Sequence, residues 1–178
     1  MKRAYWGWGV LLLVGMLAVW PSHLRAQSEF EQVTGKAFDG AVPDQFYLET
    51  NAIPVQKRNA AFLRTPAGSH ILFGLLDTSG YSSRVQTKYK GMIITEGKVS
   101  VEGAKLSVGS YGFGVEIPSD TTSDEAAKFI LYNQAGEKLA VFAAKKDPQL
   151  KQPVPLQVVI EKGGTARLYL GRYWIELK

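Results

Sequence analysis

From Gln45 onward, short runs of apolar and aromatic residues are separated by Gly, Pro, Asn and Asp. Runs of this length and composition predict β-strands. The clearest strand covers residues 110–117, where apolar residues alternate with glycine and glutamate and therefore lie on one face. Pro118 ends this strand, because proline has no N–H to donate to a neighbouring strand.

Several strand pairs are predicted to form hairpins, because a short glycine-containing turn separates them. They are residues 129–133 with 138–143, 156–161 with 165–170, and 92–95 with 98–101. Further strands are expected at residues 45–49, 60–65 and 69–76.

The last strand contains Gly171, and its apolar residues change phase there. A one-residue β-bulge at Gly171 would return five apolar residues to one face. They are Leu168, Leu170, Tyr173, Ile175 and Leu177.

Helical signals are weak and short. Residues 82–89 fit two helical turns, and Thr122 with Glu125 has the spacing of a capping box. The sequence therefore predicts an all-β, single-domain antiparallel fold of about ten short strands with at most one or two helical turns. We expect a β-sandwich, with a partly closed barrel as the alternative.

Residues 1–26 have the order of an export signal. Lys2 and Arg3 precede an apolar run, and Pro21 breaks it before the small residue Ala26. We expect cleavage before Gln27 and a periplasmic or extracellular location without stable membrane insertion; an uncleaved anchor is the alternative. Residues 27–44 are less periodic and are expected to form a loosely ordered arm, followed by the β-domain at 45–178.

Composition restricts the chemistry. The leader holds three of the 21 basic residues and none of the 16 acidic ones, so the remaining 152 residues carry a formal net charge of +2. This near-neutral charge and its scattered lysine pairs do not predict nucleic-acid binding. The absence of cysteine from the sequence excludes thiolate nucleophiles, disulfides and Cys-ligated metals. We expect no cofactor.

Asp77 is a candidate catalytic residue. It lies in Leu75-Leu76-Asp77-Thr78-Ser79-Gly80, which resembles the active-site turn of aspartic proteases, where two apolar residues precede Asp-Thr-Gly. The resemblance implies an acid/base role for Asp77 beside a second Asp from a dimer partner. Ser79 departs from the pattern, and the simpler interpretation is a turn in which Asp77 accepts backbone hydrogen bonds.

His70 is the single histidine after the leader and so the one ordinary neutral-pH base. A Ser-His-Asp relay would need it, but the sequence has no Gly-x-Ser-x-Gly motif. We expect His70 to begin a strand.

Two further patterns suggest ligands. The acidic segment with Asp120, Asp124 and Glu125 offers oxygen donors of the kind Ca²⁺ prefers, although a solvated loop is the favoured interpretation and no metal is expected. The glycines at 109, 112 and 114 suggest a phosphate-binding loop, but inside a strand they indicate close packing.

Aromatic residues near the end of the chain suggest sugar binding. Tyr169, Tyr173 and Trp174 lie close together in sequence, and an exposed Trp174 would offer a stacking platform. Burial of Trp174 between two sheets is the favoured alternative.

These patterns lead to one functional hypothesis and two alternatives. We expect an exported protein with a binding or envelope-structural role, acting as a monomer or weak homodimer on an unidentified protein or glycan of the cell envelope. The alternatives are an aspartic-type hydrolase using Asp77 and a carbohydrate-binding module using Trp174.

Overall fold

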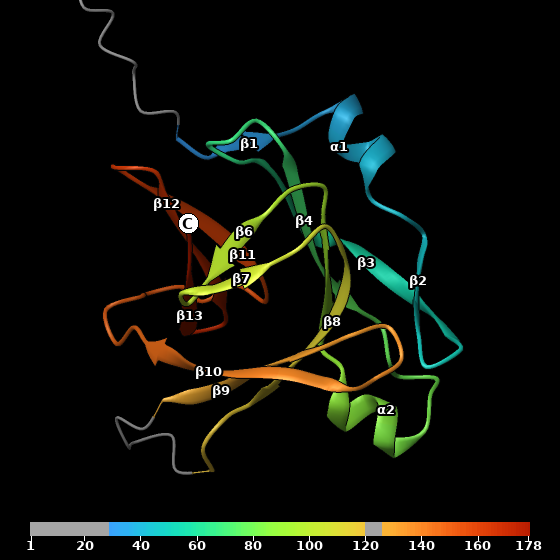
Figure 1. Cartoon of the computed structure of the whole chain (residues 1–178). Helices are drawn as coiled ribbons and strands as arrows, with labels where there is room; N and C mark the ends of the chain where they lie inside the picture. Colours follow the sequence, from blue (N-terminus) through green and yellow to red (C-terminus); the bar gives the residue numbers. More distant parts are fainter. Residues whose placement is uncertain (1–28, 120–125) are drawn as a thin grey trace, which may run out of the picture.

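Antiparallel strands make up most of the protein (Figure 1). The computed structural model describes residues 29–119 and 126–178. The two helices there are α1 (Lys36–Ala41) and α2 (Ser83–Lys88). The strands are β1 (Glu31–Val33), β2 (Gln45–Leu48), β3 (Asn51–Arg64), β4 (His70–Leu76), β5 (Gly91–Thr95), β6 (Val99–Val101), β7 (Ala104–Leu106), β8 (Gly109–Glu116), β9 (Ala127–Tyr132), β10 (Lys138–Lys146), β11 (Gln157–Glu161), β12 (Thr165–Leu170) and β13 (Tyr173–Leu177).

The strands form one antiparallel sheet that is nearly closed into a barrel-like shape. Ten of them follow the order β1-β3-β4-β5-β8-β9-β10-β13-β12-β11, while β2 pairs with β3, and β6 lies between β13 and β7. The last strand, β11, approaches β3 without pairing with it in the described residues. The predicted all-β fold of about ten strands is confirmed, and the sheet takes the partly closed form.

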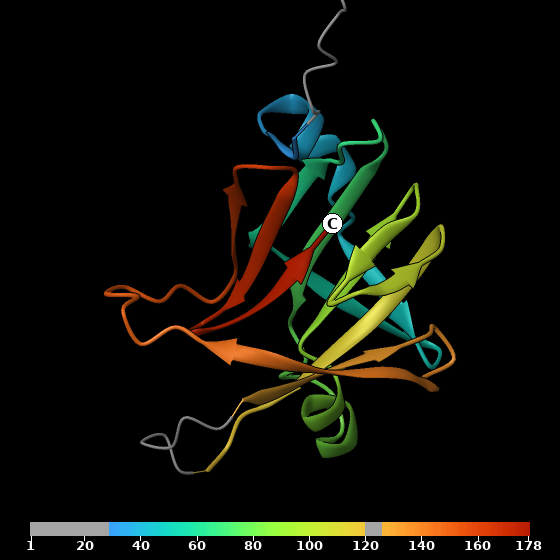
Figure 2. The same cartoon turned by 60° about the vertical axis from the view of Figure 1, so that its left-hand side comes forward.

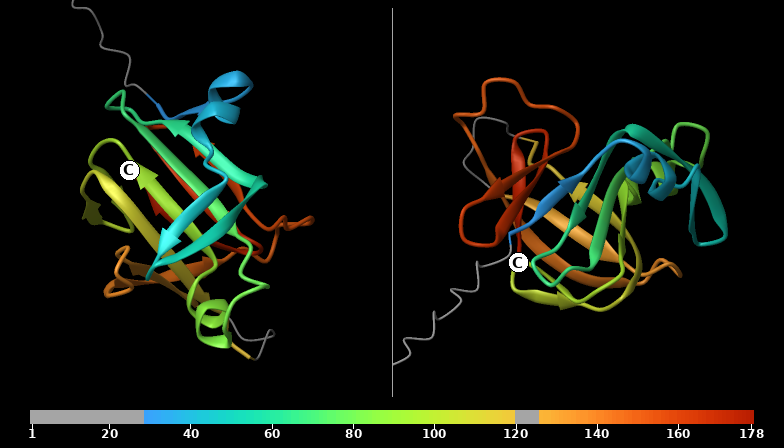
Figure 3. Two further views of the ribbon diagram at one scale, coloured as in Figure 1. Left: turned by 90° about the vertical axis from the view of Figure 1, so that its right-hand side faces the viewer. Right: turned by 90° about the horizontal axis from the view of Figure 1, so that it is seen from above.

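The main core lies between two walls of this sheet (Figure 2). Phe73, Phe113 and Phe129 come from β4, β8 and β9, and Leu168 and Ile175 come from the opposite β12 and β13. The rings of Phe113 and Phe129 stack with centroids 4.9 Å apart. Seen from above, the strands curve around this packed interior (right half of Figure 3).

A second core covers the outer face of β4, β5 and β9. Leu48 of β2, Ile53 of β3 and Tyr89 after α2 are fully buried there, together with Met92. The hairpin of β2 and β3 and the short helix α2 therefore form an extra layer on one wall (left half of Figure 3). The helical turns predicted at residues 82–89 are confirmed as α2, and Val85 and the following Tyr89 are buried.

The glycines of β8 allow this layer to pack closely. A Cβ on Gly112 would lie 2.9 Å from the Leu48 side chain, and one on Gly114 would overlap the backbone carbonyl oxygen of Lys88. The close-packing interpretation is therefore confirmed for Gly112 and Gly114, which face β2 and α2. It does not hold for Gly109, where a Cβ would meet only Tyr111 of the same strand at ordinary contact distance.

The predicted bulge at Gly171 is wrong. Gly171 has φ 63° and forms the turn between β12 and β13, whose register places Leu170 opposite Tyr173 and Leu168 opposite Ile175. Glycine at the first of two turn residues, with positive φ there, is typical of a type II′ hairpin. A hairpin places the apolar residues of β12 and β13 on one face, as a bulge within a single strand would. The change in the apolar pattern at Gly171 therefore does not distinguish a hairpin from a bulge.

Two other expectations differ from the structure. The expected hairpin of residues 92–95 with 98–101 does not form, because β5 pairs with β4 and β8 while β6 crosses to β13 and β7. The described part of the expected arm is folded: β1 pairs with β3, and the side chains of Phe30 and Val42 are buried. The hairpins of β9 with β10 and of β11 with β12 form as predicted.

Candidate functional site

His70 and Asp77 lie at opposite ends of β4. At about 3.3 Å per residue the strand separates them by about 20 Å, so they cannot share one reacting group. His70 Nδ1 lies 2.7 Å from Glu96 Oε2, and its ring stacks on Phe62. The structure therefore does not bring the two candidate catalytic residues together.

Asp77 caps the turn that follows β4. Its Oδ1 accepts hydrogen bonds from the hydroxyl group of Ser79 at 2.7 Å and from the Ser79 N–H at 3.1 Å. These bonds lower the pKa of Asp77, because they favour the ionised carboxylate. The side chain is exposed, and its geometry is that of a turn residue.

Asp77→Asn is expected to lower the melting temperature only slightly, because an amide oxygen can still accept from Ser79 and the site is solvated. Thermal unfolding at pH 7 checks this. An aspartic-type active site predicts instead an unchanged melting temperature and acid-optimum cleavage of denatured casein that disappears in the variant.

Trp174 is half-buried and its ring is occupied. Lys145 Nζ lies 4.7 Å from the ring centroid, and the Arg167 guanidinium lies 4.3 Å from it. The neighbouring Tyr169 is buried and donates a hydrogen bond to Asp147 at 3.0 Å, and Tyr173 is buried on the other face of the sheet. The three aromatic residues therefore do not form an open stacking platform for a sugar.

The predicted calcium ligands Asp120, Asp124 and Glu125 and the capping box of Thr122 lie outside the described residues. Within 29–119 and 126–178, no group of three His, Asp or Glu residues is placed to hold a metal ion.

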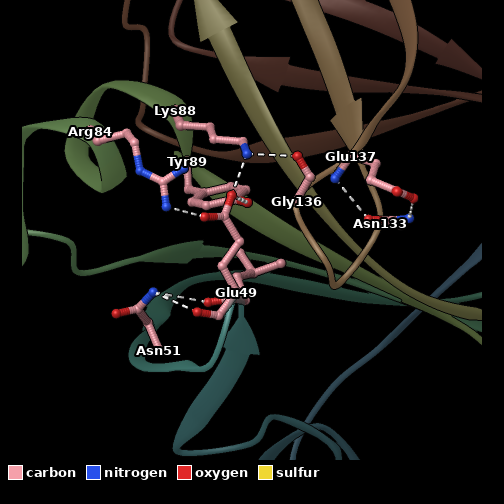
Figure 4. Close-up of polar contacts among 9 residues, drawn as sticks. Glu49, Asn51, Arg84, Lys88, Tyr89, Asn133, Gly136 and Glu137 are labelled. Atoms are coloured by element: carbon pink, nitrogen blue, oxygen red, sulfur yellow. Dashed lines mark hydrogen bonds and ion pairs between the residues drawn. The ribbon is translucent and has the colours of Figure 1, made fainter.

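A partly buried polar cluster centred on Glu49 has no local signal in the sequence (Figure 4). Glu49 and Thr50 form the two-residue turn between β2 and β3, and both have positive φ, 46° and 69°. Such type I′ turns favour Asn-Gly, and each side-chain-bearing residue in this conformation costs about 1 to 2 kcal/mol. Asn51 supports the turn by donating to the carbonyl oxygens of Leu48 and Glu49.

The strained turn places the Glu49 carboxylate among three donors (Figure 4). It forms ion pairs with Lys88 and Arg84 and accepts a hydrogen bond from the Tyr89 hydroxyl at 2.7 Å. Lys88 also donates to the Gly136 carbonyl oxygen at 2.6 Å. The cluster therefore joins the β2–β3 turn, α2 and the β9–β10 turn.

These contacts fix the protonation states in the cluster. Hydrogen bonds from Lys88 and Tyr89 lower the pKa of Glu49 from 4.5 to about 2, although burial opposes the shift. Burial, and then the hydrogen bond to Glu49, raise the pKa of Tyr89 above its usual value. Both shifts move the pKa values of Glu49 and Tyr89 away from neutral pH, which favours the ionised carboxylate and the protonated hydroxyl in the folded protein.

A different site lies beside the turn of β12 and β13. A cleft of about 640 Å³ opens there, between the end of β8, the loop after β10 and this turn. The described residues that line it are Ile117, Lys146, Pro148, Pro153, Leu170, Gly171, Arg172 and Tyr173.

Apolar groups and two cations dominate this cleft, which we call the β12–β13 cleft. Ile117 is 56% exposed at its edge and so presents apolar surface to a ligand. Arg172 donates to the Leu150 carbonyl oxygen and so fixes both the loop and its own guanidinium. None of the described lining residues carries a carboxylate or an imidazole. The described lining therefore combines apolar surface with two cationic side chains.

Comparisons with protein-family models, curated proteins and solved structures found no match to this chain. Neither α1 nor α2 is long and apolar enough to cross a membrane, and no other helix occurs in the described parts of the chain.

Proposed function

We propose that this protein is an exported binding protein that holds an apolar, negatively charged ligand in the β12–β13 cleft. The observation that carries the proposal is the combination of an apolar cleft wall with Arg172 and Lys146 at its border. An acyl chain or aromatic ring would cover Ile117 and Leu170, and its carboxylate would pair with a guanidinium that can form two parallel hydrogen bonds.

The leader predicted at residues 1–26 supports a periplasmic or extracellular location for this function. A monoanionic amphiphile is the ligand class that this lining favours, because the Arg172 guanidinium lies beside apolar surface. The barrel interior is not the binding site, since its side chains already pack against one another.

Decanoate, a carboxylate on an acyl chain, is the probe for this cleft. Ile117→Asp is expected to weaken its binding about tenfold or more, because the new carboxylate repels the probe and removes apolar contact. Arg172→Gln should weaken binding by a similar factor through loss of a charge-assisted hydrogen bond. Isothermal titration calorimetry measures both effects.

Val108→Asp is the matched control. Val108 is 66% exposed just before β8, at the other end of that strand from Ile117, so the same charge is introduced away from the cleft. Its affinity for decanoate should equal that of the wild type. Equal affinities for all the variants, or no binding by the wild type, would contradict the proposal.

A further inference from the structure

Strand β10 has a free backbone edge along most of its length. It pairs with β9 from Lys138 to Ala144, but it pairs with β13 only at Lys145 and Lys146. Figure 1 shows β10 meeting β13 near its arrowhead. After Trp174, β13 no longer pairs with β10 and instead pairs with β6 at Leu177. No strand in the described residues therefore lies beside the part of β10 before Lys145.

The hydrogen bonds at the two ends of β10 show which of its groups point to this edge. The Asp147 N–H donates to the Arg172 carbonyl oxygen at 2.8 Å, so Asp147 faces β13. Because residues on a strand alternate in direction, Lys145, Ala143 and Val141 face the same side. The N–H and C=O groups of Val141 and Ala143 therefore point to the free edge.

The other end of the hairpin gives the same alternation. The Asn133 N–H donates to the Glu137 carbonyl oxygen, which begins the ladder between β9 and β10. Because every second residue of β9 points its backbone groups toward β10, Leu131 and Phe129 do so as Asn133 does. They are therefore the hydrogen-bonded partners of Ala140 and Phe142. Val141 lies between these bonded pairs and must face away from β9.

Side chains along this edge are apolar and accessible. Val141 is 49% exposed and Leu139 is 50% exposed. A cleft of about 220 Å³ lies between β10 and β7, and its lining includes Leu106, Tyr111 and Phe142. An added strand would gain backbone hydrogen bonds from β10, and side chains on one of its faces would reach this cleft.

Charge distinguishes between possible occupants of the edge. Lys145 of β10 already pairs with Glu102 at 3.9 Å, but Lys138 is exposed at the other end of the strand, and the exposed Lys105 of β7 lines the cleft opposite it. Two copies of the chain paired through Val141 and Ala143 would bring their lysines together, which destabilises a strand pair. An acidic strand would be attracted instead.

We propose that the free edge of β10 binds an extended peptide of a partner protein, with alternating apolar residues flanked by acidic ones. This interaction is separate from the β12–β13 cleft. The peptide would extend the sheet through Val141 and Ala143, and its acidic residues would lie near Lys138 and Lys105.

Three synthetic peptides test this proposal in titrations monitored by ¹H–¹⁵N NMR. The first has the sequence Glu-Val-Thr-Val-Thr-Val-Glu, the second has Lys in place of both Glu residues, and the third replaces the central Val with Pro. The Glu-ended peptide should bind about tenfold or more tightly than either of the others, and the amides of Val141 and Ala143 should shift most.

Val141→Glu should reduce binding of the Glu-ended peptide about tenfold, whereas Val159→Glu, a control on β11 that is 39% exposed and outside this cleft, should not change it. Equal binding of the Glu-ended and Lys-ended peptides would overturn the proposal, and so would shifts confined to other strands. A dimer in sedimentation that Val141→Glu dissociates would assign the edge to a second copy and would also overturn it.

Discussion

Glu49→Gln is expected to lower the free energy of unfolding at pH 7 by about 2 kcal/mol. A pKa of about 2 in the folded protein against 4.5 in the unfolded chain corresponds to about 3 kcal/mol, and solvent access through Arg84 screens part of it. The substitution leaves Lys88 and the Tyr89 hydroxyl without their carboxylate partner in a largely buried place. Urea unfolding measures the effect.

The pH dependence of this effect has a defined sign. Because the folded pKa is depressed, Glu49 contributes its full stabilisation above about pH 4.5, and the contribution is lost as the pH falls toward 2. The difference between wild type and Glu49→Gln should therefore shrink over that window. Glu116→Gln is the control, because its ion pair with Lys128 is exposed and 3.9 Å long, and it should change stability little at any pH.

Gly114→Ala is expected to destabilise the protein by about 2 to 3 kcal/mol. The added methyl group would overlap the backbone carbonyl oxygen of Lys88, so α2 must move away from β8. Gly80→Ala is the matched control, because a Cβ there meets no atom within 4 Å, and it should change stability by less than about 0.5 kcal/mol. Thermal and urea unfolding measure both.

The effects of Gly114→Ala and Glu49→Gln on stability should also be coupled. Moving Lys88 weakens its contact with Glu49, so the double variant Gly114→Ala/Glu49→Gln should be less destabilised than the sum of the single effects. Strict additivity would show that the packing of α2 on β8 does not position the cluster.

Clean alternation made β8 and the hairpins after it predictable from sequence. The first half of β3 was missed, because Pro54 and the polar residues 57–59 interrupt its apolar pattern. Pairing with β2 and β4 forms this strand all the same, with a register shift between Gln56 and Ala60. Here, long-range pairing overrides the local pattern.

The sites were less predictable than the strands. The Glu49 turn lacks the Asn-Gly signal, and its partners Lys88 and Tyr89 are 39 and 40 residues away in sequence. The β12–β13 cleft combines residues from β8, the loop after β10 and the Gly171 turn, which no local motif connects. By contrast, the turn role of Asp77 followed from neighbouring residues alone, and its bonds to Ser79 agree with that prediction.

A ¹H–¹⁵N NMR titration with decanoate tests the proposed ligand site most directly. We expect saturable shifts in the amides of Ile117, Lys146 and residues 170–173, which border the β12–β13 cleft. The amides of Val141 and Ala143 should stay in place, because they belong to the separate edge of β10. Absence of saturable shifts, or shifts centred on residues outside the cleft, would contradict the proposed binding function.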